Sequence, residues 1–176
     1  MVHTTYHLTT PRPDLRPCDV ICPDPNAGAP LVGIYNDGLF TILDKIASNS
    51  ILVPWNWLIG NDAAALMTTG TGDVFFWKPS VGVHFLEVQR AEVVFIDGEF
   101  RWFFKEFLVN PSVVDDVLHK PLVDLLVHIH RPLSYGETFI LVPWLMIGGT
   151  DNVNRYEIGK CSVYLDLVSQ TYLKNR

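Results

Sequence analysis

The feature that most constrains the fold is the stretch from Gly72 to Ile96, GDVFFWKPSVGVHFLEVQRAEVVFI. It contains three apolar runs separated by residues typical of turns, at 73–77, 83–88 and 91–96. This pattern predicts a three-stranded antiparallel meander. Side chains alternate between the two faces of a strand, and both faces of the first two runs are apolar. The sheet is therefore expected to be covered on both sides, with Trp77, Phe85 and Val94 in its core.

Helical spacing follows the meander. Residues Phe100, Phe103, Phe104, Phe107 and Leu108 recur at i, i+3, i+4, i+7 and i+8, which predicts an amphipathic helix with a phenylalanine-rich core stripe. Asn110-Pro111 and Lys120-Pro121 each predict a further helix start. The second of these helices is expected to bury Leu122, Leu125, Leu126 and Ile129. Residues 138–142 predict a strand and residues 155–173 a final helix.

The chain before the meander is rich in proline and turn residues. Residues 1–30 contain six prolines, which predict an extended arm or irregular lead-in. Asn36-Asp37-Gly38 is a strong turn signal and predicts a hairpin, and residues 63–69 predict another strand. The expected fold class is α+β: a mostly antiparallel sheet around the meander 72–96, packed with C-terminal helices. Residues 31–176 are expected to form one domain.

Charge narrows the choice of partner. The net charge is −6, and residues 62–137 hold 11 acidic and 6 basic side chains. This balance argues against direct binding of nucleic acid, which requires a basic face. An acidic surface suits a basic protein partner, although a plain solvated surface is the alternative. No apolar run reaches the length of a membrane span and no secretory signal is evident, so the expected location is the cytoplasm, with the three cysteines as free thiols.

The sequence contains no recognisable catalytic set. It lacks HExxH, GxSxG, Walker and CxxC motifs, and its six histidines do not assemble into a known pattern. These observations favour a binding protein over an enzyme, without a cofactor. One weak alternative is a zinc site or zinc-dependent enzyme that uses an N-terminal set of ligand types: His3, His7, Cys18 and Cys22.

Several motifs, taken in order, resemble a known family. They are GDVFFW, GVHFLEVQRAEVVFI, the phenylalanine-rich helix, RPLSYGETFILVPWLMIGGTDNV and YLDLVSQ, and the resemblance that they carry covers residues 61–170. The resemblance is to bacterial immunity proteins of type VI secretion DNase effectors, whose domain often follows a GAD-like region. The chain departs from the family pattern at Arg131, Phe139 and Trp144. Residues 31–60, which include DGLFTIL, are a candidate for a shortened GAD-like part.

The resemblance implies a non-catalytic antitoxin. Such a protein binds its cognate secreted toxin in the cytoplasm, here a DNase domain with a basic cleft, and the Gly, Pro and Trp positions of the motifs are interpreted as structural. A module of the same fold for another toxin class, or for a regulatory complex, is the alternative. Exposed turn, acidic and aromatic residues are the expected partner contacts: Asn36, Asp37, Trp55, Trp57, Glu87, Glu92, Asp115 and Asp116. The two tryptophans are also candidates for the core.

Overall fold

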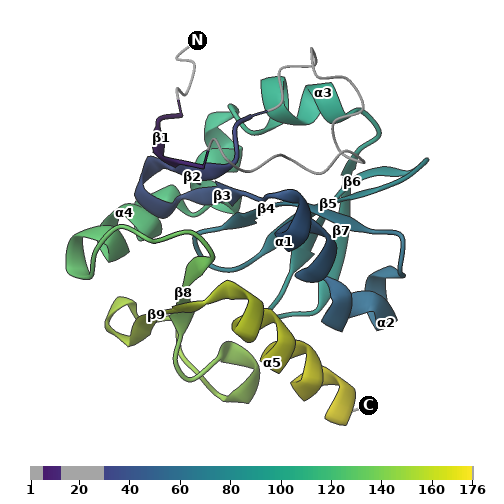
Figure 1. The fold of residues 1–176 in the computed structure, drawn as a ribbon. Coiled ribbons are helices and arrows are strands. Elements are labelled where there is room, and N and C mark those ends of the chain that lie inside the picture. The colour runs from purple at the N-terminus through teal and green to yellow at the C-terminus, as the bar shows by residue number, and fades with distance from the viewer. Residues whose placement is uncertain (1–5, 13–29, 176) are drawn as a thin grey trace.

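A seven-stranded antiparallel sheet, whose strands follow chain order, forms the centre of the fold in the computed structural model (Figure 1). The structure describes residues 6–12 and 30–175. The strands are β1 (Leu8–Pro11), β2 (Gly33–Tyr35), β3 (Phe40–Ile42), β4 (Ala64–Thr69), β5 (Val74–Lys78), β6 (Gly82–Glu87) and β7 (Glu92–Asp97). The predicted α+β class and the meander β5–β6–β7 are confirmed. The predicted hairpin is also confirmed, since a 3-10 turn, η1 (Asn36–Gly38), joins β2 to β3.

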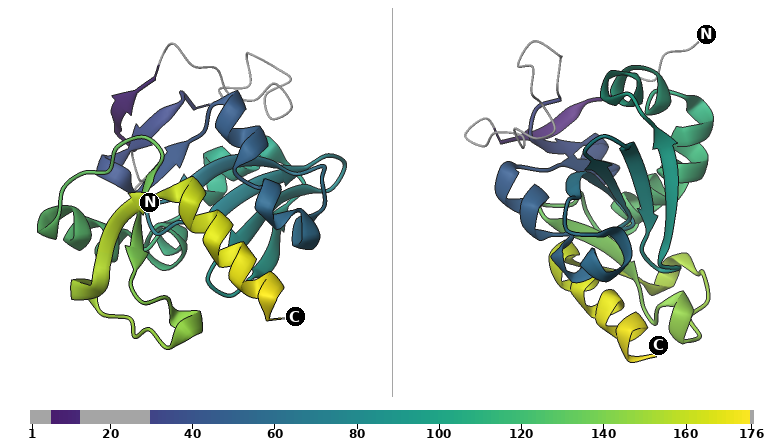
Figure 2. Two further views of the ribbon diagram at one scale, coloured as in Figure 1. Left: turned by 60° about the horizontal axis from the view of Figure 1, so that its bottom comes forward. Right: turned by 90° about the vertical axis from the view of Figure 1, so that its right-hand side faces the viewer.

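Helices cover both faces of the sheet (Figure 2). The covering elements of one face are α3 (Phe100–Trp102), the π-helical turns η3 (Phe103–Phe107) and η4 (Val113–Val117), and α4 (Lys120–Ile129). Those of the other face are α1 (Lys45–Ser50), the 3-10 turn η2 (Val53–Trp55), α2 (Asn56–Ile59) and α5 (Cys161–Lys174). Adjacent residues of β5 reach the two layers, because Phe75 packs with the first group and Phe76 with the second.

The C-terminal part also contains a second, two-stranded sheet of β8 (Glu137–Leu141) and β9 (Tyr156–Lys160). Between these strands lie two 3-10 turns, η5 (Leu145–Ile147) and η6 (Val153–Arg155). The predicted final helix was therefore wrong over 155–160, because Arg155 ends η6 and residues 156–160 pair with β8. Gly159 permits the approach, since a Cβ there would lie 2.5 Å from Cδ1 of Ile140.

Two burial predictions on α4 were wrong. Leu125 and Ile129 are 45% and 44% exposed, whereas the unpredicted Val123 is fully buried beside Gly70. Helical spacing predicted that α4 has an apolar face, but the docking of α4 against η1 decided which of its apolar residues are buried.

Among the helices of residues 6–12 and 30–175, none is long and apolar enough to cross a membrane.

Candidate functional site

The site with the most functional promise is a groove of about 520 Å³ on the open side of β6 and β7. We call it the acidic groove. Its floor comes from Phe85, Glu87, Val94 and Ile96 of the two strands. One wall comes from the η3–α4 region: Phe107, Asp116, Val117, His119 and Leu122. The remaining lining comes from turns and from the β8–β9 sheet with its connection: Thr71, Asp73, Gln89, Arg90, Leu145, Asp151 and Tyr156.

Acidic side chains from separate parts of the chain meet in this groove. Asp73 precedes β5, Glu87 ends β6, Asp116 belongs to η4, and Asp151 lies between β8 and β9. Arg90 is the one lysine or arginine among the described lining residues, and its Nη1 lies 3.2 Å from Oε1 of Glu87. The groove therefore carries excess negative charge over an apolar floor.

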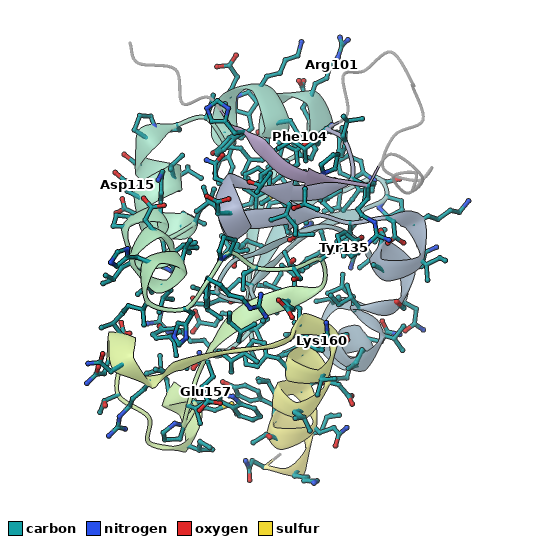
Figure 3. The ribbon with its side chains drawn as sticks, turned by 60° about the vertical axis from the view of Figure 1, so that its left-hand side comes forward. Arg101, Phe104, Asp115, Tyr135, Glu157 and Lys160 are labelled. Atoms are coloured by element: carbon teal, nitrogen blue, oxygen red, sulfur yellow. The ribbon has the colours of Figure 1, made fainter. Side chains whose placement is uncertain are left out.

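Two further acids border the groove. Glu92 of β7 lies directly opposite Glu87 in the strand register. Asp115 neighbours Asp116 on η4 and lies at the outer surface of this helical wall (Figure 3). Like charges directly opposite each other on neighbouring strands repel. The pair of glutamates therefore favours a bound cationic group.

Asp73 lies under the groove and organises the turn between β6 and β7. Its Oδ1 accepts a hydrogen bond of 2.8 Å from the backbone N–H of Val88, and its own N–H donates to Oγ1 of Thr69. Burial raises the pKa of Asp73 to about 7; the Val88 hydrogen bond opposes this effect, and the negative charge of Glu87 adds to it. The carboxyl group is thus held partly protonated near neutral pH.

We expect Asp73→Asn to flatten the pH dependence of stability. The pKa of Asp73 is higher in the folded protein, so the unfolded chain binds fewer protons between about pH 4 and pH 7. Stability from this residue is therefore greatest below about pH 4 and falls as pH rises towards 7. The substituted amide still accepts from Val88 and stays neutral. Urea unfolding should show that the free energy of unfolding of the variant rises by about 2 kcal/mol relative to that of wild type between about pH 5 and pH 8. The same pH dependence of the free energy of unfolding in both proteins would contradict the expectation.

The structure brings four of the expected partner contacts to this site. Glu87 and Asp116 line the groove, and Glu92 and Asp115 border it. Asn36 and Asp37 lie elsewhere, because they anchor β1: Oδ1 of Asn36 accepts from the N–H of His7, and the N–H of Asp37 donates to Oγ1 of Thr9. Neither lines the groove.

The tryptophans belong to the opposite layer. Trp55 as a partner contact was wrong, because its side chain is fully buried and its Nε1–H donates to the carbonyl of Leu165. Trp57 is partly buried, and its Nε1–H donates to Oγ of Ser169 at 2.8 Å. Both indole rings thus pack against other parts of the protein, and both Nε1–H groups have hydrogen-bond acceptors within it.

Sequence reasoning missed three parts of the site. Asp73 and Asp151 were noted only as parts of family motifs, GDVFFW and RPLSYGETFILVPWLMIGGTDNV. Val94 was expected in the core, but it is 50% exposed, because β7 lies at the end of the sheet beyond the helical cover. The flanking acids Glu92 and Asp97 were the available sign that this run borders water.

The zinc alternative falls mostly on residues that the structure does not describe. His3, Cys18 and Cys22 lie outside the described residues, and His7 is the only one of the four that the structure describes. Within 6–12 and 30–175, His, Cys, Asp and Glu form no group of three or more that could hold a metal ion.

Comparison with known proteins bears on the groove wall. Residues 99–171 match the family described as T6SS immunity protein Tdi1, C-terminal. The resemblance to type VI secretion immunity proteins is therefore confirmed over this segment. The matched segment includes η3, η4, α4 and the β8–β9 sheet, and it therefore contains the groove residues Asp116 and Asp151.

A solved structure shows the fold as a whole. The crystal structure of Atu4351 from Agrobacterium tumefaciens superposes with a TM-score of 0.62 at 15% sequence identity, covering 93% of this chain and 85% of that chain. At this identity the similarity establishes the fold alone. A comparison with curated proteins gives no match.

Proposed function

We propose that this chain is an immunity protein that binds and neutralises a nuclease toxin delivered by type VI secretion. The observation that carries the proposal is the acidic groove, one wall of which lies in the segment that matches the immunity family. A nuclease must present cations along the path of the DNA phosphates. A groove with excess negative charge and an apolar floor is complementary to such a surface in both charge and desolvation.

Inhibition of the toxin by binding requires no catalytic step in the immunity protein. The described groove offers carboxylates, a histidine and an arginine, but their only close charge contact is the Glu87–Arg90 pair. We propose that the protein acts by sequestration, without catalysis, in the cytoplasm of the toxin-producing cell. We also propose that residues 31–176 act as one immunity-type domain and 1–30 as an arm. In support, residues 31–60 contribute β2 and β3 to the same sheet as the meander, and the described part of the arm adds only the edge strand β1, which pairs with β2.

Co-expression with the effector gene next to this one tests the proposal. We expect wild-type protein to restore growth and to elute with the effector's toxin domain in gel filtration. We expect the double variant Glu87→Lys/Asp116→Lys to weaken the complex about a hundredfold or more, because charge reversal of two groove residues replaces attraction with repulsion. The affinity should also fall with rising salt concentration.

A double variant with the same change in net charge serves as the control. Glu157→Lys/Asp166→Lys alters two acids outside the groove, on β9 and α5. It should bind within about threefold of wild type, since long-range steering alone changes mainly the association rate. An effector that stays lethal and forms no complex with wild-type protein would overturn the proposal. Neutralisation of an effector without nuclease activity would instead favour the same fold serving another toxin class.

A further inference from the structure

β7 has an open outer edge. It is the last strand of the seven-stranded sheet, and no other strand of the described chain pairs with it there. Three consecutive side chains of β7 are exposed: Val93 by 39%, Val94 by 50% and Phe95 by 56%. Proteins usually protect such an edge with lysines, prolines or a covering element, because unpaired strand groups readily accept another strand.

The backbone of β7 presents hydrogen-bonding groups at that edge. The N–H of Val88 donates to Asp73, so Val88 does not close the hairpin ladder, and the pair Glu87–Glu92 is its first hydrogen-bonded pair. Hydrogen-bonded and non-hydrogen-bonded pairs alternate along an antiparallel ladder. Val93 and Phe95 therefore direct their N–H and C=O groups away from β6. The ladder becomes irregular only beyond His84 and Phe95.

The acidic residues near the open edge of β7 determine which kind of strand can pair with it. Glu92 and Asp97 lie at the two ends of β7, and Glu87 and Asp116 line the groove beside it. A second copy of this chain is disfavoured, because antiparallel pairing of two β7 strands would bring Glu92 of one copy towards Asp97 of the other. A strand with lysine or arginine facing the groove would instead meet complementary charge.

We propose that β7 is a docking strand that takes an extended basic segment of a partner protein as an eighth strand of the sheet. Partner side chains on the groove face would be Lys or Arg, beside Glu92 and Glu87. Those on the other face would be aliphatic, against Val93 and Phe95. Main-chain hydrogen bonds supply affinity in this mode of recognition, and alternate side chains supply specificity. Identifying the partner with the toxin rests on the proposed function; the docking strand itself does not.

Matched variants at one position test the main-chain contact. Val93→Pro removes an N–H that faces away from β6, so the ladder to β6 is kept, whereas Val93→Thr keeps both this N–H and the β-branched shape. We expect Val93→Pro to weaken binding of the effector's toxin domain about tenfold or more and Val93→Thr less than about threefold. Circular dichroism and thermal unfolding of each free variant check that the fold is retained.

A peptide probe makes the test independent of the effector. A nine-residue peptide of alternating Lys and Val should slow amide hydrogen exchange at Val93 and Phe95 of the full chain, and an alternating Glu and Val peptide should not. Binding of the toxin domain at full strength by Val93→Pro would overturn the docking strand while leaving the proposed function standing. If the toxin domain does not bind wild-type protein at all, the proposed function is contradicted. Amide exchange at Val93 and Phe95 with the Lys peptide then tests the docking strand by itself. Equal protection by both peptides, no protection by the Lys peptide, or a dimer of the free chain through β7 would each overturn it.

Discussion

Replacing Trp55 with alanine is expected to lower the free energy of unfolding by about 3–5 kcal/mol. The side chain, at the end of η2, is fully buried against α5, and its Nε1–H donates to the carbonyl of Leu165 at 3.1 Å. Alanine at this position leaves a large cavity and removes a buried hydrogen bond to α5. Urea denaturation of the purified protein measures the loss.

Trp102→Ala is the matched control for this prediction. Trp102 is 38% exposed on α3 and contacts the ring of Phe107, so its truncation should cost less than about 1.5 kcal/mol. If Trp55→Ala were as stable as wild type yet failed to bind the effector, Trp55 would be a partner contact, and its burial in this fold would be contradicted. The two variants thus separate structural from functional tryptophans.

The second large effect is expected at Gly72, the first residue of the GDVFFW motif. Gly72 has a φ of +93°, and a Cβ there would lie 2.6 Å from Cε1 of the buried Tyr164. Gly72→Ala combines left-handed backbone strain with overpacking, and we expect it to lower the free energy of unfolding by about 2–4 kcal/mol. Chemical denaturation measures this loss.

Two other glycines separate the causes. Gly148 has a similar φ of +89°, but nothing lies within 4 Å of the position that a Cβ would take, so Gly148→Ala should show backbone strain alone, about 1 kcal/mol. Gly98 has neither a positive φ nor a close neighbour other than a carbonyl at 3.9 Å, so Gly98→Ala should change stability by less than about 0.5 kcal/mol. Equal effects at Gly72 and Gly148 would show that contact with Tyr164 is unimportant.

Local patterns predicted the elements of this fold well. The meander and the Asn36-Asp37-Gly38 hairpin depend on alternation and turn residues that lie within a few positions of each other, so the sequence states them directly. β9 was missed because five residues of alternating character compete with helical spacing, and pairing with β8 resolved the competition. On α4, the exposed Leu125 and the buried Val123 were exchanged for the same reason, since contacts between elements decide burial.

The candidate site was less predictable than the fold. Charge in the middle of the chain indicated a basic partner, and Glu87, Glu92, Asp115 and Asp116 were expected contacts. Their gathering around one groove together with Asp151 joins residues from distant parts of the chain, which no local pattern records. Trp55 was predicted both as a core residue and as a partner contact, and its burial confirms the core interpretation, whereas Val94 was predicted in the core and is exposed. An apolar residue type does not state whether a helix layer covers it.

By itself the sequence determined that this chain forms an antiparallel meander with helices after it, carries its acidity in the middle, and resembles type VI secretion immunity proteins. These properties depend on residue order over short distances and on composition. Only the tertiary structure decided that β7 ends the sheet with an open edge and that four acids from distant parts of the chain line one groove beside it. The physical reason is that exposure and charge clustering are set by which elements pack together, and this depends on contacts between residues distant in the chain.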